Sequence, residues 1–305
     1  MDRIRTTLTA SSLLFLFCTM PVSAQPQQRS PWSFNFDGGG AHYSDTDLKD
    51  DTGSFSVDRW YLGAGVNYSW SPRNSVGASF GGGRSVYEFD ELTGFGNGEP
   101  WGTIEDARLS FSTRFGVGEK AVVFIVPTVR INGEKGASNS DSRTYGLFGA
   151  VAWRISENLT IGPGLGIFSR LEDSTRVFPV LAIDWNITDR WSLSTGRGLA
   201  SSRGPGLTLG YQLNEDWSLG LAGRYEDQEF RLDNEGVAAG GVGRDQSIPI
   251  VFSAELKPSK QLNLSVFGGL SFGGNLRLKD ASDTLIEESD YDATPIFGAT
   301  FQFRF

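Results

Sequence analysis

The chain ends in PIFGATFQFRF (295–305), where a large apolar residue recurs at nearly every second position. Phenylalanines stand at 297, 301, 303 and 305, and the residues that alternate with them are glycine, threonine, glutamine and arginine. Successive side chains of a β-strand point to opposite faces. The stretch therefore predicts a strand with one apolar and one polar face, which runs to the final residue.

Other segments repeat this period. Three clear ones are RWYLGAGVNYSW (59–70), RTYGLFGAVAWRI (143–155) and QLNLSVFGGLSF (261–272). Alternation over such lengths indicates strands, and the 39 glycines of the chain disfavour long helices. The sequence therefore predicts an all-β protein.

The predicted turns alternate between two kinds. Short ones lie at 71–74, 116–120, 156–158, 188–190, 214–216 and 258–261, and mostly longer, acidic connections lie at 44–53, 90–100, 132–142, 171–175, 201–205, 233–245 and 279–292. They separate strands at about 31–43, 54–70, 75–89, 102–115, 121–132, 143–155, 159–170, 176–187, 191–200, 206–213, 217–232, 246–257, 262–278 and 293–305. Short turns at one end and long loops at the other are typical of outer-membrane barrels. We predict a single antiparallel transmembrane β-barrel of about 14 strands, with 12 or 16 strands as alternatives and a soluble β-sandwich as the competing fold.

The first residues are typical of a secretory signal. MDRIR is a positive segment, LLFLFCTMPV is an apolar core, and VSA precedes Gln25. We predict a signal peptide at 1–24, cleaved after Ala24, and a barrel at 25–305. A lipid attachment at Cys18 is the alternative, but the preceding FLF lacks the small residues that such a site needs.

The composition excludes several classes of protein. After cleavage no cysteine remains and His42 is the single histidine, which argues against disulfide scaffolds, thiol enzymes and histidine-rich metal sites. The formal net charge of −9 argues against a nucleic-acid partner. We predict no cofactor and no metal, because the acidic connections show no ligand spacing such as that of an EF-hand.

Aromatic residues spaced by eight predict the height of a membrane band. The pairs are Trp60 and Tyr68, Tyr145 and Trp153, and Trp217 and Tyr225. Eight residues of a strand tilted by about 40° rise about 20 Å, close to the ~25 Å apolar band of outer-membrane barrels. We predict that these six residues form the two aromatic girdles.

The terminal strand also carries a family resemblance. FGATFQFRF resembles the C-terminal targeting signal of bacterial outer-membrane barrels, which implies that Phe301, Phe303 and Phe305 are recognised by the barrel-assembly machinery. The same resemblance implies a Gram-negative outer membrane, with lipid and lipopolysaccharide as surroundings. The stretch from LGYQLNEDW at 209 to YDATPIFG at 298 resembles a family of proteobacterial outer-membrane barrels with no assigned activity.

Strict alternation assigns a set of charged residues to the lumen. They are Arg59, Asp106, Arg108, Arg114, Arg130, Arg154, Arg170, Arg176, Asp184, Arg224, Glu226, Glu255, Arg277 and Arg304. Ten arginines against four carboxylates predict a cationic lumen, and a fixed charge on a pore wall selects counter-ions. The main hypothesis is a passive porin-like channel for small solutes, with anions as the preferred charge. The alternative is a non-conducting structural or surface-interaction barrel, whose arginines and carboxylates pair with one another.

Arg197 and His42 each lead to a further prediction. Alternation would direct Arg197 toward lipid at a cost of roughly 2 to 4 kcal/mol, so we predict a bulge at Thr195–Gly196 that turns it inward. His42 in GGAHYSD (39–45) is the only base available for an outer-membrane hydrolase, which is the third hypothesis. The chain lacks the HxSNG-like stretch expected of the outer-membrane phospholipase and lipid A deacylase families. We therefore predict that it is not an enzyme.

Overall fold

The structure is a computed structural model that describes residues 30–172, 174–195 and 206–305. Its strands are β1 (Trp32–Asp47), β2 (Ser54–Ser71), β3 (Asn74–Asp90), β4 (Thr103–Val117), β5 (Ala121–Glu134), β6 (Arg143–Arg154), β7 (Leu159–Ser169), β8 (Thr175–Asn186), β9 (Trp191–Thr195), β10 (Gly206–Gln212), β11 (Trp217–Arg224), β12 (Glu226–Arg231), β13 (Val242–Leu256), β14 (Leu262–Lys279), β15 (Leu285–Tyr291) and β16 (Thr294–Arg304). Two 3-10 helices, η1 (Lys49–Asp51) and η2 (Phe95–Asn97), complete the regular elements. No helix in the described ranges is long and apolar enough to cross a membrane.

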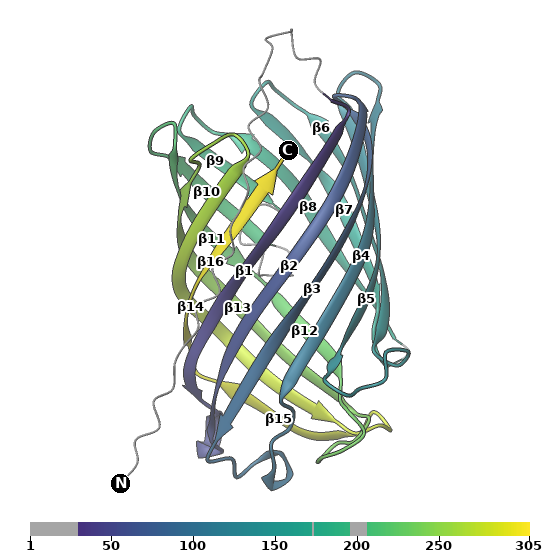
Figure 1. Cartoon of the computed structure of the whole chain (residues 1–305), viewed down its shortest axis with the longest axis vertical. Helices are drawn as coiled ribbons and strands as arrows, with labels where there is room; N and C mark the ends of the chain where they lie inside the picture. Colours follow the sequence, from purple (N-terminus) through teal and green to yellow (C-terminus); the bar gives the residue numbers. More distant parts are fainter. Residues whose placement is uncertain (1–29, 173, 196–205) are drawn as a thin grey trace, which may run out of the picture. The chain divides into compact units, whose positions relative to one another are not determined.

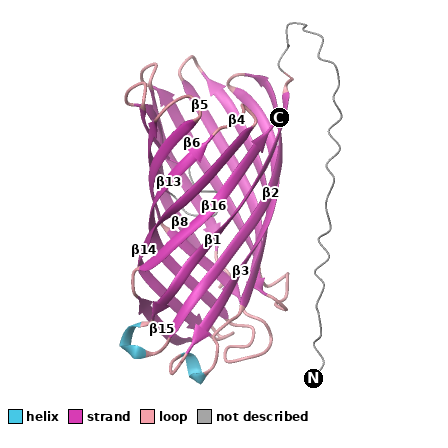
Figure 2. Ribbon diagram, turned by 60° about the vertical axis from the view of Figure 1, so that its left-hand side comes forward, coloured by secondary structure: helices cyan, strands magenta, loops and turns pink. Residues whose placement is uncertain are grey.

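The strands form a closed antiparallel barrel (Figures 1 and 2). Each strand from β1 to β11 pairs with the next, β11 pairs with β13, β13 with β14, β14 with β16, and β16 with β1. β12 continues β11, and β15 leads into β16, so the wall has 14 strands. The predicted fold class and strand count are confirmed.

The terminal strand closes the cylinder. β16 pairs with β1 from Asn35↔Arg304 to Tyr43↔Ile296. The backbone N–H groups of Phe34 and Phe305 each donate to the other residue's carbonyl, at 2.7 and 3.0 Å. Their rings stack with centroids 5.4 Å apart. The last residue is therefore held by the ladder.

The two ends of the barrel differ as the turns predicted. At one end the strands are joined by short segments at 72–73, 118–120, 155–158, 187–190, 213–216 and 257–261. The other end, called the long-loop end here, holds η1, η2 and β15 (Figure 2). The signal peptide at 1–24 and the bulge predicted around Arg197 lie outside the described residues.

The outer face is apolar. Large side chains such as Leu62, Phe80, Val177 and Val266 are more than half exposed. Near the short turns the outer face carries a ring of aromatic residues, namely Trp32, Tyr68, Trp70, Trp153, Trp191, Tyr211 and Trp217. Soluble monomers rarely expose contiguous apolar surface of this kind. The wall is built for apolar surroundings.

At the long-loop end, four strand segments leave the wall and cross the mouth. This flap consists of β12, the start of β13 (242–246), the end of β14 (275–279) and β15. One edge reaches β5 through Arg231↔Gly133, and the other meets the chain after β1 through Leu48↔Tyr291. The sequence predicted loops at 233–245 and 279–292, so it missed β15 and the start of β13.

A bulge in β14 reverses the direction of its side chains. The pairing with β13 shifts between Gln246 and Ile248, and Gly273 has a φ of +59°. Phe272 is exposed on the outer face before the bulge, whereas Leu276 and Leu278 are fully buried after it. The side chain of Arg277 therefore points to the face of the sheet opposite to Leu276 and Leu278, where it donates to Glu288 at 2.6 Å. The prediction that Arg277 faces the lumen with its strand is wrong, because alternation is lost at the bulge.

Tyr225 also lies elsewhere than predicted. It lies at the break between β11 and β12, where the flap bends away from the wall. Its hydroxyl accepts hydrogen bonds from Arg176 and Gln246 instead of facing lipid. The predicted girdle position is therefore wrong for this residue, whereas Trp60, Tyr145, Trp153 and Trp217 are exposed on the outer face.

The bulge gives the first prediction. A side chain with a branched Cβ is strained at positive φ, so Gly273→Val should lower the free energy of unfolding by about 1 to 3 kcal/mol. The matched control is Gly268→Val on the same strand, where a new Cβ would have its nearest atom 3.7 Å away. Urea unfolding of the refolded barrel measures both, and equal stabilities would contradict the assigned bulge.

Candidate functional site

A buried arginine ties the wall to the flap. Arg59 of β2 is 8% exposed and donates to Glu226 Oε2 at 3.0 Å and to Asp245 Oδ2 at 2.6 Å. Those carboxylates belong to β12 and β13 of the flap. Tyr87 and Tyr291 also donate to Asp245, at 2.8 and 2.9 Å. One guanidinium therefore holds two buried carboxylates, and with them two strands, against the opposite wall.

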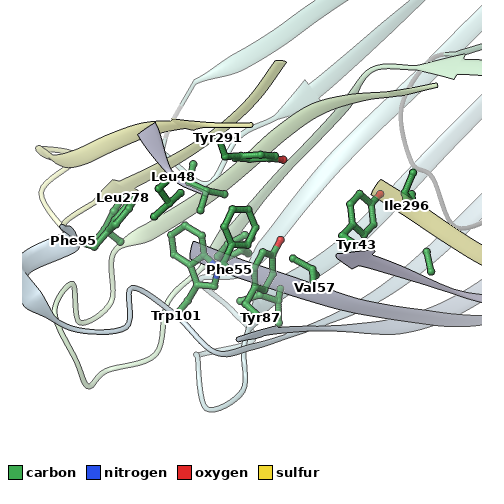
Figure 3. Close-up of a cluster of buried hydrophobic side chains, with 14 of the residues drawn as sticks. Tyr43, Leu48, Phe55, Val57, Tyr87, Phe95, Trp101, Leu278, Tyr291 and Ile296 are labelled. Carbon is green, nitrogen blue, oxygen red and sulfur yellow. The ribbon is translucent and has the colours of Figure 1, made fainter. Parts of the chain in front are cut away.

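Aromatic side chains fill the space beside this network, between the flap and β2–β4 (Figure 3). Trp101 lies at their centre, with ring centroids 5.0 Å from Phe230, 5.7 Å from Phe89 and 5.8 Å from Tyr87. Phe55 packs against Tyr291 at 4.9 Å. This part of the mouth is closed by packed side chains.

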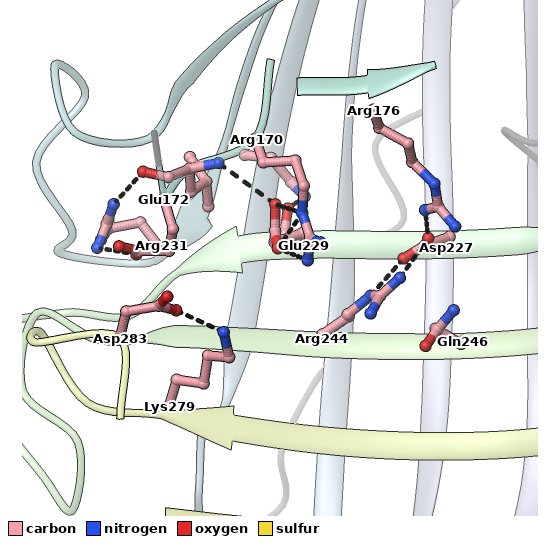
Figure 4. A network of polar contacts seen from close by, with 12 residues as sticks. Arg170, Glu172, Arg176, Asp227, Glu229, Arg231, Arg244, Gln246, Lys279 and Asp283 are labelled. Atoms are coloured by element: carbon pink, nitrogen blue, oxygen red, sulfur yellow. Dashed lines mark hydrogen bonds and ion pairs between the residues drawn. The ribbon is translucent and has the colours of Figure 1, made fainter. Parts of the chain in front are cut away.

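The free edge of the flap is joined to β8 and to the connection between β7 and β8 by ion pairs (Figure 4). Arg170 bonds Glu229 at 2.5 Å, and Arg231 bonds Glu172 at 3.1 Å. Asp227 receives both Arg176 and Arg244, the latter at 2.8 Å. Ion pairs therefore hold this edge against the wall, in place of a continuous ladder of backbone hydrogen bonds.

A cavity of about 250 Å³ lies beside that edge. Its lining comes from β5 to β8 on one side and from the chain at 225–229 on the other, and includes Arg130, Phe168, Phe178, Tyr225 and Asp227. We call it the edge cavity. It lies where the wall and the flap meet without a ladder.

A second cavity, of about 480 Å³, lies at the short-turn end. The charged residues that line it are Arg73, Arg114, Glu119, Lys120, Arg154 and Asp184. Four cations against two carboxylates make this end of the interior positive. A third, smaller cavity of about 160 Å³ is lined in part by Asn35, Asp37, Tyr61, Asp106 and Arg108.

The fourteen residues that alternation assigned to the lumen lie in several different places in the structure. Arg59, Arg224 and Glu226, the last in the flap itself, are buried; Arg130, Arg170 and Arg176 line the edge cavity; Asp106 and Arg108 line the small cavity; Arg114, Arg154 and Asp184 line the short-turn cavity. Glu255 accepts a hydrogen bond from Asn263 at 3.3 Å, and Arg304 is exposed at the end of β16. Arg277 lies on the outward side of the flap, as described above.

Sequence reasoning missed the charged residues of the flap. Asp227, Glu229 and Arg231 follow Leu219 and Leu221 at the same parity, which alternation directs toward lipid. That change from apolar to charged residues along one face was the available signal that the strand leaves the membrane wall. Asp245 was missed because it fell in a predicted loop.

The flap also pairs charges on its outward face. Arg277 bonds Glu288, and this hydrogen bond holds the pKa of the Glu288 carboxyl below its ordinary value. Asn275 donates to Glu288 and Asp290, at 3.1 and 2.9 Å. Polar side chains of neighbouring strands are therefore bonded to one another on this face.

His42 lies on the outer side of the barrel. Its Nδ1 is 2.8 Å from Asp58 Oδ1, and its ring is 5.0 Å from that of Phe297. Within the described part of the chain, no hydroxyl group hydrogen-bonds to its ring. In the described residues, this pair of a histidine and a carboxylate thus has no hydroxyl nucleophile bonded to it.

These features define a closed β-barrel with an apolar outside and an ionised, partly capped interior. The chain belongs to the family described as a domain of unknown function (DUF6268), whose model matches residues 138–297, just over half of the sequence. No curated protein matches it.

The chain is similar to several solved structures at low sequence identity. An outer membrane channel from Pseudomonas putida F1 is 10% identical, with a TM-score of 0.49 over 93% of this chain and 100% of that one. A FadL homologue from Pseudomonas aeruginosa is 12% identical, with a TM-score of 0.42 over 89% of each chain. The KdgM porin is 8% identical, with a TM-score of 0.36 over 89% of this chain and 98% of that one.

The second prediction concerns Arg59. Arg59→Met leaves Glu226 and Asp245 buried without their cation, which should destabilise the protein by about 3 to 5 kcal/mol. Hydrogen exchange should rise in β12 and at 242–247. Adding Glu226→Gln and Asp245→Asn removes the unpaired charges and should restore much of the loss, while Arg304→Met at an exposed position is the control. Unchanged exchange in the single variant would show that the network does not hold the flap.

Proposed function

We propose that the protein is an outer-membrane β-barrel channel through which small solutes pass without an energy source. The observation that supports this most directly is the combination of an apolar, aromatic-ringed outside with a closed wall around ionised cavities. Such a wall satisfies its backbone within the sheet, as a lipid environment requires. The short turns would face the periplasm and the flap the cell exterior.

Export and insertion are part of the same proposal. A signal peptide at 1–24 cleaved after Ala24, and recognition of Phe301, Phe303 and Phe305 by the assembly machinery, would bring the chain to a membrane of lipid and lipopolysaccharide. The pairing of β16 with both β1 and β14 supports this, because the proposed signal then lies in the strand that closes the barrel.

The proposed route follows β5 to β8. The flap and the aromatic cluster obstruct the side of the mouth nearest β2–β4, whereas the edge cavity lies on the other side of the flap's free edge. On the inner face of β5, Thr128 and Arg130 line the edge cavity, while Val122 and Phe124 line the short-turn cavity. A solute would pass between these two cavities.

A preference for anions is proposed from the short-turn cavity. Its four cations exceed its two carboxylates, and fixed charge of one sign in a confined space attracts the opposite ion. At the edge cavity the arginines are largely paired, so their contribution to selectivity is smaller than their number suggests.

One observation favours a non-conducting barrel as the second candidate. The buried network at Arg59 and the packed ring of Trp101 occupy the mouth with groups that make few contacts with water. In that case the barrel would serve envelope structure or surface interaction. Conductance separates the two candidates.

The third prediction is a conducting barrel with a charge preference. In planar bilayers the refolded protein should form channels whose reversal potential in a salt gradient indicates anion preference. Arg114→Glu together with Arg154→Glu should move the reversal potential toward cations, because the short-turn cavity becomes negative. Lys257→Glu, in an exposed turn, is the control for a change of net charge.

Two results would contradict the third prediction. Absence of conductance in a preparation that shows the heat-modifiable gel migration of folded barrels would favour the non-conducting candidate. Conductance with no shift in the double variant would keep the channel and reject the proposed source of selectivity.

The fourth prediction addresses the hydrolase hypothesis. Since no hydroxyl in the described residues bonds His42, we expect the refolded protein to show only background lipase and protease activity. His42→Ala should leave that background unchanged, with Asp58→Asn as its matched partner. Activity above background that both variants abolish would make the protein an enzyme.

A further inference from the structure

Two phenylalanines lie flat on the inner wall of the edge cavity. Phe168 of β7 and Phe178 of β8 have rings 5.6 Å apart and inclined by only 9°. Their neighbours Ile167 and Val177 are exposed on the outer face, so the two phenylalanines face inward. Together they form an apolar surface, which we call the aromatic platform, inside a largely polar lumen.

Glycines on the neighbouring strands make this arrangement possible. Gly146 is paired with Phe168, and Gly166 with Phe178. A Cβ at Gly146 would lie 2.3 Å from the Phe168 ring, and one at Gly166 would lie 2.4 Å from the Phe178 ring. Each ring therefore covers a glycine and leaves its other face toward the cavity.

Cationic groups lie around the platform. Arg176 has its guanidinium carbon 5.6 Å from the centre of the Tyr225 ring and shares Asp227 with Arg244. Arg170 pairs with Glu229, and Arg130 lines the same cavity. The lining of the cavity thus holds three arginines against two carboxylates, Asp227 and Glu229, next to an apolar plane.

We propose that the edge cavity binds a small aromatic carboxylate, with its ring on the aromatic platform and its carboxylate toward Arg130 and Arg176. Stacking on phenylalanine favours a flat apolar ring, and guanidinium groups favour a carboxylate. The cavity volume of about 250 Å³ suits a single ring. A sugar acid such as glucuronate fits less well, because the phenylalanine faces offer its hydroxyl groups no hydrogen-bond partner. This inference rests on the proposed channel function and names its solute class.

The test is calorimetric titration of the refolded, detergent-solubilised protein with benzoate, after subtraction of titration into empty micelles. We expect saturable binding by the wild-type protein. Benzamide, which keeps the ring without the charge, and glucuronate, which keeps the charge without the aromatic ring, should each bind about tenfold more weakly.

Matched variants locate the site. Phe178→Ala and Arg130→Gln should each weaken benzoate binding about tenfold. Phe178→Leu keeps apolar volume without an aromatic face, and it should also weaken binding if the alanine variant fails to fold. The control is Phe124→Ala, because Phe124 also lies beside an arginine, Arg114, at 5.5 Å, but in the short-turn cavity. It should leave the affinity unchanged.

Several outcomes would overturn the inference. These are absence of saturable benzoate binding in a heat-modifiable preparation, tighter binding of glucuronate than of benzoate, and an equal loss of affinity in Phe124→Ala and Phe178→Ala. Conductance is measured separately. Binding without conductance would reject the channel and keep the site, whereas conductance without benzoate binding would reject the site and keep the channel.

Discussion

The structure depends on the pairing of backbone N–H and C=O groups within one closed sheet. In hydrocarbon an unpaired backbone group has no water to replace its partner, so a spanning sheet cannot have an open edge. Here the first and last strands of the wall meet, and the hydrogen bonds between Phe34 and Phe305 complete that junction. Closure in turn separates an apolar outside from a polar inside, because side chains alternate along every strand.

A cylinder of fourteen strands is wider than its own side chains can fill. At the long-loop end, the four strand segments of the flap cross the mouth and occupy part of this width. Burial of charge under the flap is acceptable only because the charges are matched, as Arg59 is with Glu226 and Asp245. The opposite edge of the flap remains bound by ion pairs such as Arg170–Glu229. One side of the mouth is thus packed and the other is lined by polar contacts.

This asymmetry gives the interior its chemistry. Apolar packing around Trp101 removes one part of the mouth from water, and the remaining part combines arginines with the rings of Phe168 and Phe178. Neither arrangement is visible from the number of charges alone. Ten lumen arginines against four carboxylates predicted a cationic lumen, but the flap brings in Asp227, Glu229 and Asp245 as partners and leaves the clearest positive excess at the short-turn end.

The sequence alone determined the class of fold, the number of strands and the two kinds of turn, because alternation and turn chemistry are local properties that each segment carries by itself. Only the tertiary structure decided which strands leave the wall. The positive φ of Gly273 reverses the faces of β14 within one residue, and the bend at Tyr225 turns an outward face toward β8. Both effects depend on contacts across the barrel, such as Arg59 with Asp245, 186 residues apart in the chain, and no local period can report them.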